Sequence, residues 1–183
     1  KPAGVNKREV EILLSHSKKN NCKLFVAYNR RFYQSVKECK KIISNNKEPI
    51  SVNFTFTEWT HLIDFDSYTK EELEHFILCN SSHVPDIVFY LFGKPQKMSC
   101  ITAAVGSLSW HPSSRIFVGC GVTTEDIPFS YNAHWGSGGR WGVEICLSDR
   151  KLILKPLEKL QVQLNNSLYV QPYILENEEI DIK

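Results

Sequence analysis

The chain has 183 residues, of which 42% are hydrophobic and 11% aromatic, and its 22 basic residues nearly balance its 20 acidic residues. This is about the length of one domain with a substantial core, so the composition excludes a disordered or collagen-like chain. A net charge of +2 gives no long-range field for nucleic acid, and no apolar run is long enough to span a bilayer. We therefore expect a soluble protein with no nucleic-acid partner and no membrane partner.

The six cysteines are spread along the chain and contain no Cys-x-x-Cys pair. Zinc sites use closely spaced ligand pairs, and small disulfide-bonded scaffolds have a far higher cysteine density. We expect free, mostly buried thiols in a reducing cytoplasm rather than a disulfide framework, and no metal site. Because Met98 is the only methionine, we also expect the chain that starts at Lys1 to be processed or to be part of a longer protein.

The first third of the sequence alternates predicted helices with predicted strands. Asn6 and Glu9 have the spacing of a capping box at the start of a helix. The short apolar run at residues 23–27 predicts a buried strand. The apolar spacing over residues 36–43 then predicts an amphipathic helix, and strict alternation over residues 51–57 predicts a strand with one apolar and one polar face.

Two further helices precede a long series of strands. Thr69 and Glu72 predict a capped helix that runs to about Leu78, and a second helix begins near Ser82 and ends at Gly93. Candidate strands follow at residues 98–105, 115–121, 129–135, 141–147 and 151–155. This order predicts an α+β fold, in which helices pack on one face of a mainly antiparallel open sheet.

Three loops need a separate interpretation. The glycines at residues 136–139 could form a phosphate-binding loop, but strands are predicted on both sides, so a hairpin turn is favoured. The acidic segment at residues 64–66 could bind a divalent metal, but nothing near it predicts a nucleotide-binding fold, and a solvated loop is favoured. Residues 148–150 predict a tight hairpin between the last two strands.

His83 is the strongest candidate for a chemical role. It lies at a predicted helix start, where unpaired N–H groups and the positive end of the helix dipole disfavour the charged imidazolium. A neutral imidazole can take a proton from a substrate hydroxyl group within hydrogen-bond reach. The alternative is a histidine that only caps or packs at the helix end, and the spacing alone favours this alternative.

Several segments occur in an order that points to a known family. They are Lys1-Pro2, Leu24-Phe25-Val26-Ala27 followed by Tyr28-Asn29-Arg30-Arg31-Phe32, Ser82-His83-Val84-Pro85-Asp86, and Tyr90-Leu91-Phe92-Gly93 with Pro95. This order resembles the Gfo/Idh/MocA-type oxidoreductases, the family of glucose-fructose oxidoreductase and inositol dehydrogenase. The motifs cover about the first half of the chain, and the remainder fits the family's C-terminal domain in its strand pattern.

The resemblance implies a division of the chain at residue 28. Residues 1–28 would be the last helix and strand of a truncated NAD(P)-binding Rossmann domain, and residues 29–183 would form the domain that binds substrate and makes oligomers. The cofactor of the intact protein would be NAD or NADP, but the G-x-G-x-x-G motif that holds its pyrophosphate is absent from this chain. We therefore expect the chain alone to bind no cofactor and to be inactive.

The resemblance also implies two catalytic residues. Lys1 corresponds to the family's active-site lysine, and His83 corresponds to its histidine acid/base. The family often has an aspartate four residues before this histidine, but here the position is Cys79. A thiol cannot orient an imidazole as a carboxylate does, so either Asn80 substitutes for it or the chemistry differs.

The remaining implied site residues lie on both sides of the proposed domain junction. Lys1, Pro2 and Asn29 would contact the cofactor. Arg30 could hold a carboxylate or phosphate of a sugar in bidentate fashion, because its guanidinium matches the geometry of these anions. Trp59 would offer its ring to a sugar, although a tryptophan in the core is equally expected, and Asn80 would contact the substrate.

Two functions from different classes follow from these expectations. The first is an enzyme that transfers a hydride between NAD(P) and a hydroxyl group of a sugar, a nucleotide-linked sugar or a cyclic polyol. The second is a non-catalytic member of the same fold that senses sugars or acts as a scaffold, which the cysteine at position 79 favours. The enzyme is the preferred interpretation.

The strand pattern finally predicts a homo-oligomer, with a dimer as the simplest form. Trp141, Val143, Ile145 and Leu147 can line one face of the sheet. We expect aromatic and small residues on the opposite face, which would leave a broad semi-apolar surface that a like subunit covers.

Overall fold

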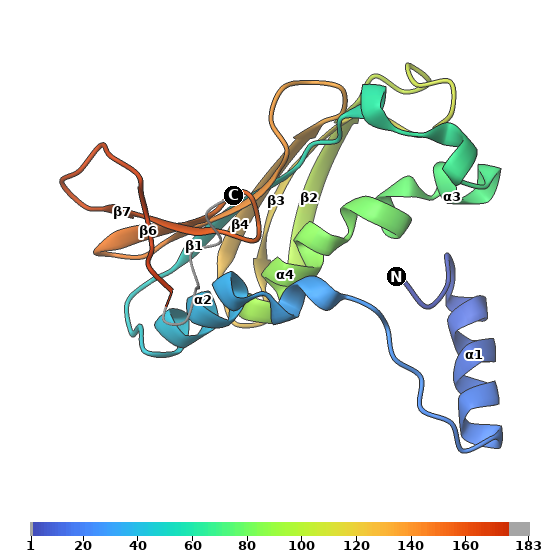
Figure 1. Cartoon of the computed structure of the whole chain (residues 1–183), viewed down its shortest axis with the longest axis horizontal. Coiled ribbons are helices and arrows are strands. Elements are labelled where there is room, and N and C mark those ends of the chain that lie inside the picture. Colours follow the sequence, from blue (N-terminus) through green and yellow to red (C-terminus); the bar gives the residue numbers. More distant parts are fainter. Residues whose placement is uncertain (1, 176–183) are drawn as a thin grey trace, which may run out of the picture.

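The computed structural model describes residues 2–175, and Figure 1 shows a curved sheet with helices along one side. Eight strands form this sheet in the order β2-β3-β4-β1-β5-β6-β7-β8. Their bounds are β1 (Ser51–Phe56), β2 (Pro95–Ala103), β3 (Ile116–Thr123), β4 (Pro128–His134), β5 (Trp141–Cys146), β6 (Arg150–Leu154), β7 (Leu160–Leu164) and β8 (Gln171–Pro172). Among the described strands β1 and β4 are the one parallel pair, so the predicted α+β fold with a mainly antiparallel sheet is confirmed.

The helices are α1 (Lys7–Lys19), α2 (Gln34–Ser44), α3 (Lys70–Glu74) and α4 (His83–Phe92), with short turns η1 (Asn29–Phe32), η2 (Thr60–Leu62), η3 (Phe65–Ser67) and the π-helical η4 (Ile77–Ser81). The helix α4 packs on β1 and β5, and α2 packs on β6 and β7. Figure 1 shows both helices on the same side of the sheet, while α1 lies apart from it. The prediction that helices pack on one face of the sheet is therefore confirmed.

The centre of the core lies between β1 and α4, and the core extends to α2 and to β5, β6 and β7. Val52, Phe54 and Phe56 alternate inward along β1 and are buried, as the period of two predicts. Around Phe54 the rings of Phe89 and Tyr131 lie 6.2 and 5.4 Å away between centroids. These aromatic contacts fix α4 against the centre of the sheet.

The capping box predicted at Thr69 and Glu72 is present, whereas Asn6 caps α1 without the reciprocal bond, because Glu9 accepts from the backbone N–H of Val5 and the side chain of Asn6. The Asn6 side chain accepts a hydrogen bond from the N–H of Glu9 at 3.0 Å, and the side chains and backbones of Thr69 and Glu72 pair reciprocally. The helix from Thr69 is shorter than predicted, because α3 ends at Glu74 and the chain then winds into the π-helix η4. An apolar period predicts a helical turn but does not distinguish an α-helical turn from a π-helical turn.

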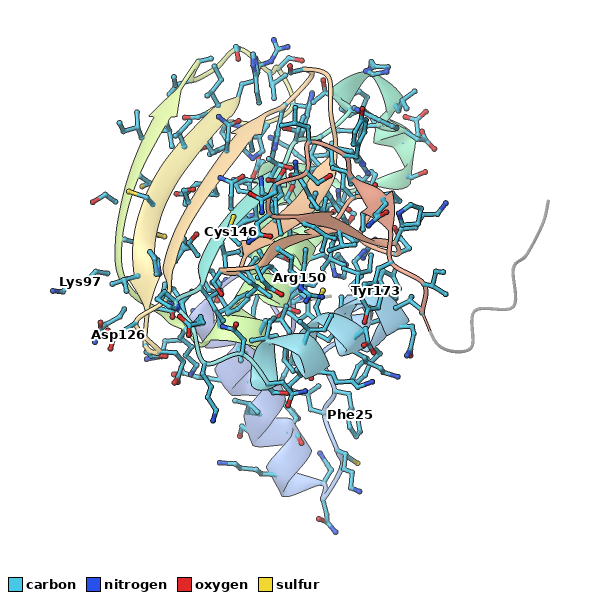
Figure 2. All side chains as sticks on the ribbon, turned by 90° about the vertical axis from the view of Figure 1, so that its left-hand side faces the viewer. Phe25, Lys97, Asp126, Cys146, Arg150 and Tyr173 are labelled. Carbon is cyan, nitrogen blue, oxygen red and sulfur yellow. The ribbon has the colours of Figure 1, made fainter. Side chains whose placement is uncertain are left out.

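The predicted strand at residues 23–27 is wrong. This segment is extended but pairs with no strand among residues 2–175, and Phe25 is 83% exposed. Figure 2 shows Phe25 on the segment between α1 and η1, away from the sheet. An apolar run forms a strand only when a neighbouring strand satisfies its backbone groups, and the described chain offers none here.

The glycine-rich loop is not a hairpin turn, although strands flank it as predicted. The two strands that it joins, β4 and β5, lie on opposite sides of β1. Residues 135–140 therefore cross over the end of β1, and the N–H of Gly136 donates to the carbonyl of Glu58 at 2.7 Å. Gly136 has a φ of +83°, and a Cβ there would lie 2.6 Å from the Arg115 guanidinium, so the crossing requires glycine at this position. The hairpin predicted at residues 148–150 does join the paired strands β5 and β6.

The two faces of the sheet differ in composition. Trp141, Val143 and Ile145 are buried on the helix side, as one predicted face. The strand register puts Asn53, Ser130, Val118 and Ile101 on the opposite face. The expectation of aromatic residues there is wrong, because the aromatic residues of β1, β3 and β4 share the phase of Phe54 and pack under the helices.

Replacing Phe54 with alanine tests the assigned core. We expect Phe54→Ala to lower the free energy of unfolding by about 3–5 kcal/mol, because it leaves a cavity between β1 and α4. Phe25→Ala is the matched control and should change stability by less than about 0.5 kcal/mol, since its ring is exposed. Chemical denaturation measures both values, and a large loss in Phe25→Ala would contradict the assignment of residues 23–27 outside a strand.

Candidate functional site

The candidate site is built where β1 ends. Beyond Phe56 the chain continues through Thr57 and Glu58, which are both buried, to the half-exposed Trp59. Glu58 has the same inward phase as Phe54 and Phe56, so the strand directs a carboxylate toward the helix side of the sheet. The side chain of Glu58 is 2% exposed.

Four donors from two other segments surround the Glu58 carboxylate. Its Oε1 accepts hydrogen bonds from the Ser81 hydroxyl at 2.6 Å, the Trp141 indole N–H at 2.9 Å and the Asn80 amide at 3.1 Å. Its Oε2 accepts from the Arg140 guanidinium at 2.7 Å. Burial raises the pKa of Glu58 above its usual value, although the four donors act in the opposite direction.

The π-helix η4 supplies two of these donors and leads directly into α4. Asn80 and Ser81 are the final two residues of η4, and both side chains donate hydrogen bonds to Glu58. The wider turn ends at Ser82, and His83 is the first residue of α4, as the sequence predicts. Glu58 therefore holds the chain two residues before the candidate base.

His83 is buried among aromatic rings. Its ring meets the Tyr28 ring edge to face at 5.6 Å and lies 5.9 Å from the Trp141 ring, between centroids. The Tyr28 hydroxyl donates to the Ser82 hydroxyl at 3.2 Å, so the segment before η1 covers the start of α4. A bidentate ion pair between Arg31 and Asp86 fixes η1 to α4 on the same side.

Two arginines pack on the Trp141 ring. The guanidinium carbon of Arg30 lies 4.7 Å from the ring centroid, and that of Arg140 lies 5.0 Å from it. Arg140 also lies 5.3 Å from the ring of Trp59. The buried Nε of Arg30 has no hydrogen-bond partner within residues 2–175. The geometry supplies cationic N–H donors beside a histidine at a helix start.

The structure brings together the three substrate residues implied by the resemblance, and the implied cofactor residue Asn29 directly precedes one of them, Arg30, in η1. Arg30, Trp59 and Asn80 all lie in the cluster around Glu58 and Trp141. No hydrogen bond or ion pair of the described chain joins Pro2 or Asn29 to these side chains. Lys1 lies outside the described residues, so its role stays a prediction.

Sequence reasoning missed Glu58, Arg140 and Trp141 as members of the site. The signal for Glu58 was available, because it is a charged residue in the inward phase of an amphipathic strand, where burial requires partners. The signal for Arg140 and Trp141 was not, because their place beside Glu58 depends on the crossing of the glycine loop over β1.

The described residues do not provide a cradle for a dinucleotide. Such a cradle needs a strand, a glycine turn and a helix N-terminus that meets the pyrophosphate. The glycine loop here joins two strands.

The described residues also hold no cluster of three or more metal-ligating side chains, and no disulfide joins the cysteines, all six of which lie in this part of the chain. Within this part, no helix has the length and apolar character needed to cross a bilayer.

No protein-family model and no curated protein matches the sequence. Solved structures match the fold closely. A dehydrogenase (MviM) from Clostridium difficile matches with a TM-score of 0.72 at 20% identity, over 95% of this chain and 54% of that one. UDP-N-acetylglucosamine 3-dehydrogenase GnnA from Acidithiobacillus ferrooxidans matches with a TM-score of 0.67 at 12% identity, over 98% of this chain and 55% of that one.

A third similar structure is an inositol dehydrogenase homolog from Azotobacter vinelandii in complex with NAD+, with a TM-score of 0.67 at 12% identity over 91% of this chain and 47% of that one. The chain thus spans about half the length of the proteins that it matches. Its fold is that of the C-terminal domain of Gfo/Idh/MocA-type oxidoreductases, and at these identities the likeness establishes the fold alone.

The pH dependence of stability tests the environment of Glu58. Because its pKa is raised in the folded state, the folded protein binds more protons than the unfolded chain between the usual glutamate value and the raised one. The contribution of Glu58 to the free energy of unfolding is therefore present at low pH and is lost as the pH rises through that window. We expect wild type to lose stability relative to Glu58→Gln as the pH rises from about 4 toward neutrality.

Thermal or chemical unfolding at a series of pH values measures this difference. Glu48→Gln, at an exposed loop position, is the matched control and should track wild type. A difference between wild type and Glu58→Gln that does not change with pH would contradict the raised pKa.

Proposed function

We propose that this chain is the substrate-binding part of an NAD(P)-dependent oxidoreductase. The intact protein would transfer a hydride to or from a hydroxyl group of a sugar, a nucleotide-linked sugar or a cyclic polyol. The observation that supports this most is the convergence of His83, Arg30 and Asn80 on one cluster, in a fold shared with structures described as dehydrogenases. The cofactor would be held by a dinucleotide-binding domain, of which residues 1–28 would be the end.

His83 would act as the acid/base. Oxidation of a hydroxyl group releases a proton, and a neutral imidazole at the start of α4 can accept it. Lys1 would polarise the same oxygen and, with Pro2 and Asn29, contact the cofactor. Because the Tyr28 ring covers one edge of His83, the proposal requires Tyr28 to move aside when substrate binds.

Arg30, Trp59 and Asn80 would orient the substrate. The Arg30 guanidinium, whose Nε has no hydrogen-bond partner among residues 2–175, would hold a carboxylate or a phosphate. Trp59 keeps part of its ring exposed beside a cavity of about 310 Å³ that Asn80 also lines. A cytoplasmic location stays a prediction from the cysteine pattern.

A second candidate function is a non-catalytic protein that senses sugars or acts as a scaffold. Two observations favour it: residue 79 is a cysteine in η4, and the Asn80 amide donates to Glu58. If the site has decayed, Cys79→Asp should produce activity from an inactive wild type. Robust turnover of any sugar by the wild-type intact protein would eliminate this second candidate.

Turnover of a His83 variant tests the proposed enzyme. In the intact protein, His83→Ala should lower kcat by about a hundredfold or more, because no other group would accept the hydroxyl proton, while the affinity for NAD(P) stays unchanged. Steady-state kinetics and calorimetric titration with the cofactor measure the two effects. His75→Ala, at the end of α3, is the matched control. Near-normal turnover of His83→Ala would end the assignment.

We also propose that the open face of the sheet pairs with a second copy of the chain. On this face β2 and β3 place Ile101, Val118 and Cys120 side by side, and all three are exposed. Exposed apolar residues that lie side by side on a sheet favour association, and a two-fold dimer is the commonest closed solution.

The two faces of β2 allow a matched test of this dimer. Ile101 is 74% exposed on the open face, and Met98 is 55% exposed on the helix side of the same strand. We expect Ile101→Lys to shift the mass measured by light scattering from dimer to monomer, because a buried lysine in the interface would lack a partner. Met98→Lys should remain dimeric. A monomeric wild type at high concentration would overturn the proposal.

A further inference from the structure

Arg140 stands half exposed at a cavity in a fixed orientation. Its side chain is 42% exposed, and it lines a cavity of about 310 Å³ together with Glu58, Trp59 and Asn80. Behind it, the buried Glu58 carboxylate accepts its hydrogen bond at 2.7 Å. The rings of Trp59 and Trp141 lie 5.3 and 5.0 Å from its guanidinium carbon.

This arrangement leaves most of the guanidinium donors available. An arginine side chain carries five N–H donors, and among the described residues only the one to Glu58 is engaged in a side-chain hydrogen bond. The two indole rings and the buried carboxylate restrict the rotation of the group before any ligand arrives. A pre-oriented planar fork with free donors matches a carboxylate in geometry and charge.

The rest of the cavity suits a hydroxylated ligand of small size. Asp64 and Ser67 also line it, and the Asp64 carboxylate can accept hydrogen bonds from hydroxyl groups. A cavity of about 310 Å³ is at the lower end of the range for small-molecule pockets, which fits a single sugar ring better than a nucleotide-linked sugar.

We propose that the ligand of this cavity is a monosaccharide-sized sugar acid, whose carboxylate binds Arg140 and whose hydroxyl groups face Asp64 and Asn80. This inference rests on the proposed function for the identity of the cavity as the substrate site, and it narrows the substrate to one chemical class. Glu58 acts as the positioning residue for Arg140.

Binding measurements without cofactor test the inference directly. Calorimetry of the 183-residue chain with D-glucuronate, D-glucose and UDP-glucose compares an acid, its neutral counterpart and a nucleotide-linked sugar. We expect glucuronate to bind about tenfold more tightly than glucose, since a hydrogen-bonded charge pair adds about this factor. UDP-glucose should bind no better than glucose.

Two arginine variants separate a local effect from a general one. Arg140→Met should remove the preference for glucuronate over glucose, because the cavity then has no guanidinium to pair with a carboxylate. Arg150→Met is the matched control, because Arg150 pairs with Asp149 at the hairpin between β5 and β6, and it should keep the preference. Circular dichroism and thermal unfolding confirm that both variants are folded.

The outcomes also separate this inference from the proposed function. Preferential binding of glucuronate without turnover in the intact protein would support the sugar-acid site and contradict the oxidoreductase. Turnover of neutral sugars with equal affinities for glucuronate and glucose would overturn the sugar-acid inference and support the oxidoreductase. Tighter binding of UDP-glucose than of glucuronate, or a preference that persists in Arg140→Met, would likewise overturn the inference.

Discussion

A single buried carboxylate joins the three segments from which the candidate site is made. Glu58 extends from the end of β1 and accepts hydrogen bonds from the turn before α4 and from the start of β5. A carboxylate removed from water is strongly unfavourable unless donors replace its hydration, and here four donors do so. Each partner therefore depends on the others, because removing one leaves the carboxylate or a buried donor unsatisfied. The position of His83 relative to Trp141 and Arg140 follows from this network.

The sheet topology explains why these segments meet. The insertion of β1 between β4 and β5 makes β1 parallel to β4 and antiparallel to β5. The connection from β4 to β5 must then cross the end of β1, and the glycine loop makes that crossing with Gly136 bonded to the Glu58 carbonyl. The crossing delivers Arg140 and Trp141 to the carboxylate. On the other side, α4 packs over β1 and brings its first residue, His83, to the same end.

Periodicity in the sequence was sufficient for the elements and for some of the site. The alternation over β1, the apolar spacing of α2 and the capping pairs at Asn6 and Thr69 each depend on local geometry, so they could be predicted. The location of His83 at a helix start was also local information. Neighbours in a sheet are not local, because a period of two fixes which face a residue occupies but not which strand lies beside it.

The predictions that were wrong are those that depend on contacts between segments distant in the sequence. Residues 23–27 have the composition of a strand, but a strand exists only with a partner, and the described chain has none there. The glycine loop has the composition of a hairpin turn, but its strands are not neighbours. The inward phase of Glu58 was enough to predict a buried carboxylate. Its donors could not be predicted, because Arg140 lies 82 residues away in the sequence and Ser81 lies 23 residues away.

The most direct test of this account is the pH titration of the Trp141 indole N–H resonance by NMR. This group donates to the Glu58 carboxylate at 2.9 Å, so its chemical shift should follow protonation of Glu58, with a midpoint above the usual glutamate value. The indole N–H groups of Trp59 and Trp135 donate to the backbone carbonyls of Gly139 and Phe56, which do not titrate, and they serve as internal controls. The account predicts a titration at Trp141 that is absent at Trp59 and Trp135 and is abolished by Glu58→Gln. A Trp141 resonance that does not titrate, or that titrates at the ordinary glutamate value, would contradict a buried carboxylate at the centre of the site.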